Sequence, residues 1–460
     1  MDRLLGAVIS AGFYHKSHPP QQPGASSLDP TGVSRYNGAR FSLPRYASGL
    51  HPRRVLRRPS SSADATGLTH KGRNTTTQTF DPAMIPTPDY VYVTTPEVLA
   101  DVAATMARAR VIGVDTEADS LHCYQEQVSL IQISDGVLNA VIDPLLLPDL
   151  HPLAPVLADP GVIKVFHGAD YDVVGLKRDF GFTIATIFDT CLAAQAAGAP
   201  KYSLGDLLQR YFEVTLEKKY QKAHWSKRPL APDLLTYAAK DTQYLPALHE
   251  LLRKEVDARG RLAQIEEEGE WISRREWTGH AFVPDDYTRI KGASALPPPA
   301  QRVLRSLAAT RDRLAKRANR PPFKIVSADD LLALAVHQPT TPATVEALFP
   351  SASSPVRRDI ARWIEAVHAG LADESPLPQR AGGRFDPFSA AQERLFVRLR
   401  EWRTAQSKGE SVEPAMVLST EQIKTIVRAW PKTINELAAV PGIRRWQVAR
   451  YGEALLGLLT

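Results

Sequence analysis

Short apolar runs, each ended by polar residues or glycine, alternate with helix-like patterns between residues 90 and 258, and this alternation limits what the chain can fold into. Strands are predicted at 111–117, 128–134, 139–142, 163–167 and 184–188. Helices are predicted at 96–109, at 170–180 and over most of 190–258. The first three strands have short connections, which predicts an antiparallel meander. Strands interleaved with helices predict an α/β domain.

Proline-rich breaks at 296–300 and 373–387 divide the rest of the chain into two helical blocks. At roughly 150 residues per domain, a chain of 460 residues has room for about three domains. We therefore predict an α/β domain at 85–290, a first small helical domain at 295–372 and a second at 386–460.

The two helical blocks repeat weakly at an offset of 92 residues, with Ser327 and Thr341 aligned to Ser419 and Thr433. In both copies a serine two residues before an acidic residue opens an apolar-periodic helix, which predicts an N-cap followed by a negative charge in the first turn. A coincidence of helical packing is the alternative. The shared helix start and the repeated Pro-x-Thr favour duplication.

The net positive charge of the chain comes from its first 84 residues. The chain has 56 Lys and Arg against 50 Asp and Glu, a net charge of +6. Residues 1–84 hold 11 Lys and Arg, 4 Asp and no Glu, so they carry +7 and the remainder carries −1. The net charge therefore gives no argument for nucleic-acid binding by the rest of the chain.

The composition of residues 1–84, rich in Ser, Pro, Gly, Arg and Thr, predicts a disordered basic tail. Such a tail resembles an organellar transit peptide, or it is translated sequence upstream of a true start at Met84. We favour the second interpretation, because Met84 directly precedes the first ordered pattern.

Two cysteines, Cys123 and Cys191, stand alone without a Cys-x-x-Cys pair. This excludes a disulfide framework or a cysteine zinc site and indicates a reducing compartment, so a cytoplasmic location is expected. The longest apolar opening, at 4–13, is half of the roughly 20 residues that span a bilayer, so no membrane association is predicted.

Two carboxylates end the first predicted strand, Asp115 and Glu117, and side chains two residues apart on a strand point to the same face. Two adjacent anions at the end of a buried strand repel each other, and a hard divalent cation would compensate them. The alternative is a strand that runs into a solvated loop, and from this pair alone we would favour it.

Two further elements carry acidic residues. Asp170 and Asp172 follow the strand at 163–167, where Asp170 could cap the next helix and Asp172 could point toward the first pair. Tyr237 and Asp241 are four residues apart, on one face of a predicted helix. Each element alone is weak, because a Tyr–Asp stripe is usually only a partly buried surface.

Together the three elements resemble the exonuclease motifs of the DEDD superfamily, in its tyrosine-containing branch. Segments around them are similar to ribonuclease D and to the nuclear exosome-associated 3′–5′ exonucleases, at 166–169, 188–190, 202–204, 218–221 and 225–230. The two helical blocks resemble HRDC domains. The resemblance implies an α/β exonuclease domain with a ribonuclease H-like mixed sheet, followed by two small all-α HRDC-like domains.

The resemblance also implies a two-metal mechanism, for which carboxylates suit Mg²⁺ or Mn²⁺. Asp115 would bridge both ions, Glu117 and Asp241 would complete the site that binds the attacking water, and Asp172 would hold the second ion. Tyr237 would orient the water, since its ordinary pKa near 10 makes it a poor base.

Two groups of basic residues could contact nucleic acid. Lys218, Lys219, Lys222 and Arg228 lie between the second and third motifs, interleaved with aromatic residues that could stack on bases. Trp225, Pro229 and Leu230 are expected to pack this loop onto the domain instead. In the first helical block, the candidates are Arg311, Lys316 and Arg317, although a charge run is usually only a solvated face.

The second block contains Gly442 in a turn that leads into a basic helix, which could present backbone N–H groups to phosphate. The first block has no glycine at the equivalent turn. His167 is interpreted as a packed strand-end residue rather than a general base.

We therefore expect a metal-dependent 3′–5′ exoribonuclease that releases nucleoside 5′-monophosphates from RNA with a single-stranded 3′ end, such as tRNA precursors, and that acts as a monomer. A 3′–5′ DNA exonuclease of the same superfamily is the first alternative, because carboxylates do not distinguish RNA from DNA. A catalytically silent RNA-binding adaptor is the second, but all four carboxylates are present.

Overall fold

The computed structural model describes residues 90–279, 281–378 and 387–460. The predicted tail at 1–84, with the question of a start at Met84, and part of the break at 373–387 lie outside the described residues. Within the described residues, no helix is both long and apolar enough to cross a membrane. Cys123 and Cys191 are free thiols.

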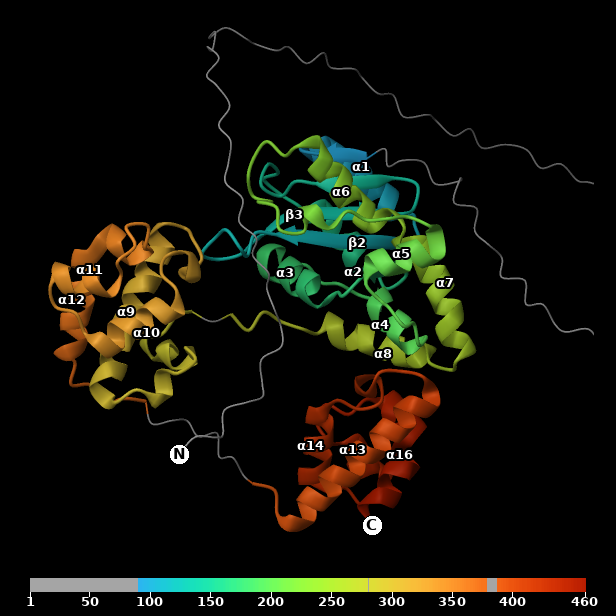
Figure 1. Cartoon of the computed structure of the whole chain (residues 1–460). Coiled ribbons are helices and arrows are strands. Elements are labelled where there is room, and N and C mark those ends of the chain that lie inside the picture. The colour runs from blue at the N-terminus through green and yellow to red at the C-terminus, as the bar shows by residue number, and fades with distance from the viewer. Residues whose placement is uncertain (1–89, 280, 379–386) are drawn as a thin grey trace, which may run out of the picture. The chain divides into compact units, whose positions relative to one another are not determined.

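A mixed sheet is the centre of the α/β domain (Figure 1). Its strands are β1 (Tyr90–Val93), β2 (Val111–Ala118), β3 (Val128–Ser134), β4 (Asn139–Ile142), β5 (Ile163–Phe166) and β6 (Ile187–Asp189). The spatial order is β1-β4-β3-β2-β5-β6. β2, β3 and β4 pair antiparallel, which confirms the predicted meander. The pairs β1–β4, β2–β5 and β5–β6 are parallel, so the sheet is mixed as expected.

Two strands differ from the prediction. β1, which pairs in parallel with β4, is absent from it. β6 starts at Ile187 rather than at residue 184. Thr186 has a φ of 51°, which turns the chain just before β6, and Ile184 packs into the core without pairing in the sheet.

The helices divide into three groups along the chain. The α/β domain contains α1 (Pro96–Met106), α2 (Ala154–Ala158), α3 (Asp170–Phe180), α4 (Thr190–Ala196), α5 (Leu204–Phe212), α6 (Pro232–Gln243), α7 (Leu245–Ala258) and α8 (Leu262–Ser273). The first helical block contains α9 (Pro298–Arg317), α10 (Ala328–His337), α11 (Pro342–Leu348) and α12 (Ile360–Leu371). The second contains α13 (Ala390–Glu410), α14 (Thr420–Ala429), α15 (Ile434–Ala438) and α16 (Arg445–Leu459). Short 3-10 turns are η2 (His151–Leu153), η3 (Lys218–Tyr220), η4 (Pro284–Arg289), η5 (Ala293–Ala295), η6 (Pro322–Lys324), η7 (Pro355–Asp359) and η8 (Pro414–Met416).

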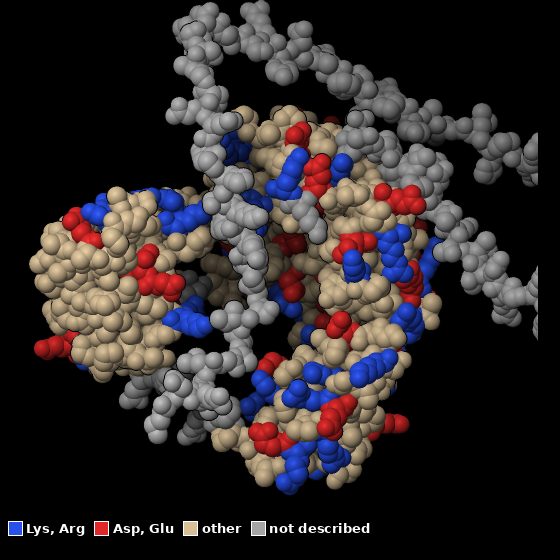
Figure 2. Space-filling view, in the orientation of Figure 1, with Lys and Arg blue, Asp and Glu red and all other residues tan. Residues whose placement is uncertain are grey.

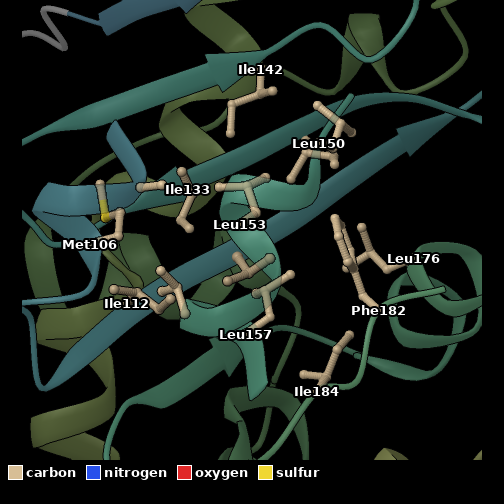
Figure 3. Packing of buried hydrophobic residues seen from close by; sticks show 14 of the residues in the cluster. Met106, Ile112, Ile133, Ile142, Leu150, Leu153, Leu157, Leu176, Phe182 and Ile184 are labelled. Atoms are coloured by element: carbon tan, nitrogen blue, oxygen red, sulfur yellow. The ribbon is translucent and has the colours of Figure 1, made fainter. Parts of the chain in front are cut away.

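Apolar side chains cover both faces of the sheet. Ile112 of β2 and Ile133 of β3 point to one face, where they pack with Met106 of α1 and Leu157 of α2 (Figure 3). Leu130 of β3, Val141 of β4 and residues of α6 form a cluster on the other face. Burial of both faces explains why β3 is apolar along most of its length rather than alternating.

Each helical block has its own core, and the two blocks start their helices in the same way. Ser327 caps α10 by accepting a hydrogen bond from the Asp330 N–H, and Ser419 caps α14 through the N–H of Gln422. Thr341 and Thr433 cap α11 and α15. The predicted N-caps and the predicted alignment of the two blocks are therefore confirmed.

The boundary between the α/β domain and the first block lies before residue 290. Tyr287 of η4 is fully buried, and its ring packs in the core of the first block with Val303 and Leu307 of α9. The sequence prediction placed residues 282–290 in the α/β domain, because the only visible break was the proline run at 296–300.

Gly113 lets two helices approach β2 closely. A Cβ atom at this position would lie 2.7 Å from the carbonyl oxygen of Thr242, near the end of α6, and 2.9 Å from Cβ of Leu245, which begins α7. The lack of a side chain at Gly113 therefore sets how near α6 lies to β2, and α6 carries Tyr237 and Asp241.

We expect the Gly113→Ala substitution to lower the free energy of unfolding by about 1–3 kcal/mol, because the clashing atoms belong to the backbone or adjoin it and cannot rotate away. Gly457 of α16 is the matched control: a Cβ there meets no atom within 4 Å beyond its own helix. Ala at Gly457 should raise stability by roughly 0.5–1 kcal/mol. Urea unfolding of both variants measures this, and equal stabilities would contradict the close packing at Gly113.

Candidate active site

β2 carries Asp115 and Glu117 on the face of the sheet that α6 covers. Asp115 lies opposite Gln132 of β3, and Glu117 lies opposite Leu130, which belongs to the core under α6. The shared face follows from the two-residue period of a strand. The expected convergence of these two carboxylates is observed.

α6 adds the third carboxylate. Asp241 is 8% exposed, and ligand oxygens of Asp115, Glu117 and Asp241 all lie within 4.8 Å of one another. Tyr237 lies one turn earlier on the same helix, and its hydroxyl donates to the carboxylate of Asp241; burial raises the pKa of Asp241, and this hydrogen bond offsets only part of the rise. Three acidic groups from two distant segments therefore meet at one point.

Asp172 is held beside these groups by β2. Its Oδ1 accepts hydrogen bonds from the Thr116 backbone N–H at 3.0 Å and from the Thr116 hydroxyl at 2.6 Å. Asp170 forms an ion pair with Arg275 at 3.0 Å instead. Of the two acidic residues that open α3, only Asp172 faces the group on β2, and Thr116 is a positioning residue that the sequence did not reveal.

Asp189, the last residue of β6, fixes the start of α3. Its carboxylate accepts hydrogen bonds from the N–H groups of Gly168 and Ala169, at 3.1 and 2.9 Å, and from Cys191 and Leu192 at the start of α4. Gly168 has a φ of 82°, a conformation that favours glycine. The segment 188–190 was noted in the sequence only as part of the family pattern, and its contacts explain why an Asp stands there.

Aromatic packing holds Tyr237 in place. The Trp225 ring stacks near the Tyr237 ring with centroids 6.1 Å apart, and Tyr220 meets it edge-on at 5.7 Å. Trp225 is 1% exposed and Leu230 packs against the same cluster, which confirms that they anchor the loop. The same expectation is wrong for Pro229, which is exposed.

Asp115, Glu117 and Asp241 open into a cleft of about 420 Å³. Its lining consists of Asp115, Thr116, Glu117, His167, Ser203, Leu204, Gly205, Leu216, Glu217, Gln221, Tyr237, Asp241 and Leu245. Among these described lining residues there is no Lys or Arg. His167 directly follows β5, and its Nδ1 lies 3.0 Å from the Thr190 hydroxyl, but the residue also lines the cleft. Burial lowers the pKa of His167, so its imidazole is neutral at neutral pH.

Burial raises the pKa of all four carboxyl groups. The pKa rises to about 6 for Asp172, to about 7 for Asp241 and to about 9 for Glu117. The pKa of Asp115 rises well above its usual range, because the group is desolvated and is repelled by the other three carboxylates. A bound cation would remove this repulsion. Oxygen-only ligands of this kind fit Mg²⁺ or Mn²⁺.

Without a bound cation, the stability of the folded protein should fall as the pH rises from about 6 to about 9. In the unfolded chain these carboxyl groups have pKa values near 4, so they are already ionised at pH 6. The folded protein still holds protons on Asp172, Asp241 and Glu117 in this range, and raising the pH therefore favours unfolding.

Thermal unfolding in EDTA across this pH range measures the effect. Mg²⁺ should restore stability most at the upper end, because it binds the deprotonated carboxylates. The Asp115→Asn variant, which lacks one of the repelling charges, should show a weaker pH dependence. A melting temperature in EDTA that rises with pH in the parent would contradict the expectation.

The basic residues between the second and third motifs have different surroundings. Lys219 and Lys222 are exposed, and the Lys219 ammonium lies 2.7 Å from Glu217. Lys218 begins η3. Arg228 corrects the prediction: its guanidinium donates to both oxygens of Asp143, at 2.6 and 2.7 Å, and to the carbonyl of Ser129. These bonds hold the loop to the sheet and leave the group unsuited to a phosphate.

The candidates on α9 also differ among themselves. Lys316 and Arg317 are exposed in the last turn of the helix. Arg311 is partly buried and donates to the carbonyl of Val326, so it is turned into its own domain. In Figure 2, Lys and Arg are interspersed with Asp and Glu on the described surface in view, as a near-neutral body requires. Contact of nucleic acid with Lys316 and Arg317 stays a prediction.

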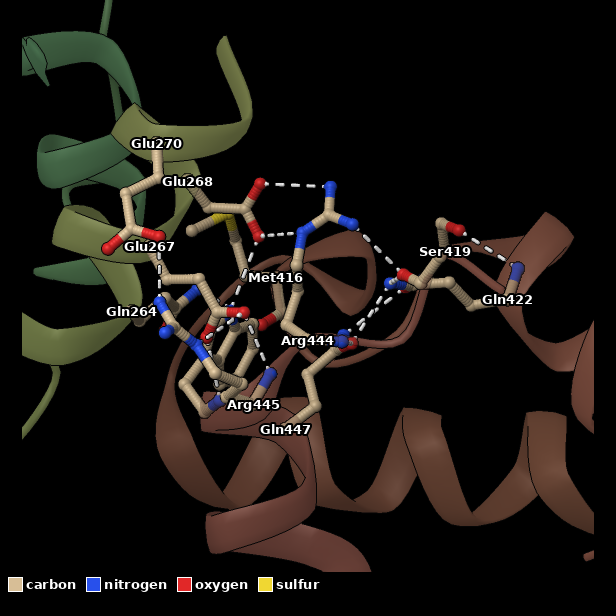
Figure 4. A network of polar contacts seen from close by, with 12 residues as sticks. Gln264, Glu267, Glu268, Glu270, Met416, Ser419, Gln422, Arg444, Arg445 and Gln447 are labelled. Carbon is tan, nitrogen blue, oxygen red and sulfur yellow. Dashed lines mark hydrogen bonds and ion pairs between the residues drawn. The ribbon is translucent and has the colours of Figure 1, made fainter. Parts of the chain in front are cut away.

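The turn before α16 is occupied by a carboxylate of α8 (Figure 4). Glu267 accepts hydrogen bonds from the backbone N–H groups of Arg445 and Trp446, at 2.8 and 2.9 Å. Arg444 pairs with Glu268 at 3.0 Å and stacks over the Trp271 ring. The N–H groups that were expected to face phosphate are therefore bound within the protein.

We expect the Glu267→Ala substitution to expose the amides of Arg445 and Trp446. Loss of a charged acceptor costs about 1–3 kcal/mol, so their hydrogen exchange should accelerate by roughly 5- to 100-fold. Exchange measured by mass spectrometry on peptides from this turn gives the rate. Glu266→Ala removes the same charge from an exposed position on α8 and is the control. Equal exchange in the two variants would contradict the role of Glu267.

Comparison with known proteins identifies the three folded parts. Residues 90–257 match the 3′–5′ exonuclease family, and residues 300–367 and 392–459 match the HRDC domain family. The solved structure of Escherichia coli RNase D, described as an exoribonuclease involved in structured RNA processing, has a TM-score of 0.60 and 25% identity, and the match covers 81% of this chain and 99% of that one.

Two curated relatives extend the match. Ribonuclease D of Desulfotalea psychrophila is 29% identical over 343 residues, which are 73% of this chain and 90% of the relative. Exosome complex exonuclease RRP6 of Saccharomyces cerevisiae is 30% identical over 284 residues, and the match covers 58% of this chain but only 39% of that protein. Both domain matches and the order of the domains agree with the predicted fold. The chain therefore carries a 3′–5′ exonuclease domain followed by two HRDC domains, and over most of its length it is similar to the ribonuclease D exoribonucleases of the DEDD superfamily.

Proposed function

We propose that the chain trims the 3′ end of RNA, such as a tRNA precursor, and that Asp115, Glu117, Asp172 and Asp241 hold two divalent ions, Mg²⁺ or Mn²⁺, for this reaction. The convergence of Asp115, Glu117 and Asp241 in a cleft whose described lining has no Lys or Arg, with Asp172 bound to the neighbouring Thr116, carries the proposal. Two such ions, about 3.5–4 Å apart when bound, activate a water and stabilise the charge that develops on the phosphate and on the leaving 3′ oxygen.

The carboxylates divide into two sets by their contacts. Asp115, Glu117 and Asp241 share one small region, which suits the site that receives the attacking water. Asp172 is held by two hydrogen bonds from Thr116, the residue next to Asp115 on β2. This position suits a ligand for a second ion. Asp115 is repelled by Asp172 as well as by Glu117 and Asp241, and in this proposal it serves both ions.

Tyr237 acts as a hydrogen-bond donor in this proposal. Burial and the neighbouring carboxylates raise the pKa of Tyr237 far above its usual value, so the hydroxyl keeps its proton. A protonated hydroxyl can orient a water molecule but cannot act as a base. His167 is neutral and lines the cleft, where it can donate or accept one hydrogen bond to the substrate.

A path for the RNA chain leads away from the cleft past Tyr237. A smaller hollow of about 170 Å³ shares Leu216, Glu217 and Tyr237 with the cleft and adds Lys219 and Lys240. Lys219 pairs with Glu217, so Lys240 is the cation that suits a phosphate preceding the scissile bond. In this proposal the protein acts as a monomer and releases mononucleotides from the RNA.

Asp172→Asn and Asp170→Asn are a matched pair of variants that tests the assignment. We expect Asp172→Asn to lower the rate of trimming by roughly 100-fold or more, because it removes charge where the transition state needs it. Asp170→Asn should keep most of the activity, since Asp170 pairs with Arg275 outside the cleft. Mononucleotide release from RNA that carries a label within its chain, with Mg²⁺, with Mn²⁺ and with EDTA, measures the rate.

Equal activity of the two variants would contradict the metal-site assignment. The same assay with DNA of matched sequence separates the proposal from the alternative, because an RNA enzyme should prefer the ribose polymer. Equal rates on both polymers would favour the DNA exonuclease, and retained RNA binding without any release would favour the silent adaptor.

A further inference from the structure

A second group of metal-ligating side chains lies outside the cleft. Ligand atoms of Asp119, His122 and His224 all lie within 4.8 Å of one another. Asp119 and His122 belong to the connection that follows β2, whereas His224 belongs to the loop that precedes α6. The catalytic cleft includes none of these three residues in its lining.

The carboxylate of Asp119 is fully buried, and none of the described Lys or Arg residues pairs with it. Its Oδ2 accepts hydrogen bonds from Ser226 and from Cys123, and it lies 3.0 Å from Nδ1 of His224. Its Oδ1 is buried and has no hydrogen-bond partner. Leaving a carboxylate oxygen in this state costs several kcal/mol.

The two histidines present a second unpartnered atom. The rings of His122 and His224 are stacked, with centroids 4.2 Å apart and planes 19° apart. The imidazole nitrogens of histidine are common metal ligands. Nε2 of His122 is buried and has no hydrogen-bond partner. One cluster therefore holds an oxygen and a nitrogen that both lack partners.

The chemistry of these ligands differs from that of the catalytic carboxylates. One carboxylate and two imidazoles are typical of Zn²⁺, whereas oxygen-only sites suit Mg²⁺. The Cys123 thiol lies 3.4 Å from Oδ2 of Asp119 and could supply a fourth ligand. We propose that Asp119, His122 and His224 bind one Zn²⁺ ion, with Cys123 or a water molecule in the fourth position.

Such an ion would join the two segments that lead into the active site. Asp119 follows β2, which carries Asp115 and Glu117, and His224 precedes α6, which carries Tyr237 and Asp241. A bound Zn²⁺ would therefore fix these segments to each other at a place separate from the catalysis. The proposal does not depend on the proposed substrate.

The ammonium group of Lys324, in η6, lies next to the proposed zinc site. Its ammonium nitrogen lies 3.3 Å from Nδ1 of His122. A cationic side chain beside the cluster would weaken binding of a metal ion, so removal of this charge in Lys324→Ala should tighten it. A purely structural hydrogen-bond cluster would show no such effect.

The full 460-residue chain without an affinity tag, dialysed against excess Mg²⁺ and then assayed for zinc by mass spectrometry, tests the proposal. We expect about one equivalent of Zn²⁺ per chain, as for a single three- or four-ligand site. His224→Ala should lose it, and because the His224 side chain is 47% exposed, this variant should fold. His151→Ala, at a side chain that is 84% exposed, is the control and should keep it. Asp115→Asn should also keep it, which separates this site from the cleft.

A titration of the parent chain with Co²⁺ adds a readout that needs no variant. Four-coordinate Co²⁺ absorbs visible light strongly, and a thiolate charge-transfer band that disappears in Cys123→Ser would assign the fourth ligand. Zinc contents that are equal in His224→Ala and His151→Ala, or zinc that is lost in Asp115→Asn, would overturn the proposal. Weak, octahedral Co²⁺ absorption would overturn it as well.

Discussion

Repulsion among Asp115, Glu117, Asp172 and Asp241 is the constraint on which the rest of the structure depends. Asp115 lies among three other acidic groups, and its pKa rises well above the usual range for that reason and because it is buried. Neutral groups hold these carboxylates together. Thr116 donates two hydrogen bonds to Asp172, and Gly113 lets α6 lie close to β2. In the proposed function, a divalent cation bound by these carboxylates would both stabilise the domain and make it active.

Local patterns predicted most of this arrangement, and long-range contacts account for what they missed. The period of two on β2 and the four-residue spacing of Tyr237 and Asp241 each follow from one element, so the sequence shows them directly. Thr116 bonds to Asp172 across 56 positions, and no local pattern can reveal that. The zinc-type cluster was missed for the same reason, because the absence of a Cys-x-x-Cys pair excludes only sites whose ligands are close in sequence.

The sequence also does not show which basic side chains are already paired within the protein. A run of basic residues indicates where cations gather but not whether each one already has a partner. The guanidinium of Arg228 is paired with Asp143, whereas Lys222, six residues earlier in the same loop, is exposed. The partner that makes the difference, Asp143, lies 85 positions away in the sequence. Exposure together with the lack of an internal partner, rather than charge alone, therefore selects candidates for contact with RNA.

Glu267 shows what this means for the second HRDC domain. A carboxylate and a phosphate oxygen compete for the same backbone N–H groups at a helix start, because both are anionic acceptors. The turn before α16 already holds Glu267, and Arg444 beside it holds Glu268. Nucleic acid could use this turn only by displacing two charged partners that are fixed on α8. The contacts of this turn therefore serve to dock the domain against α8, and any RNA contact by this domain has to come from another face.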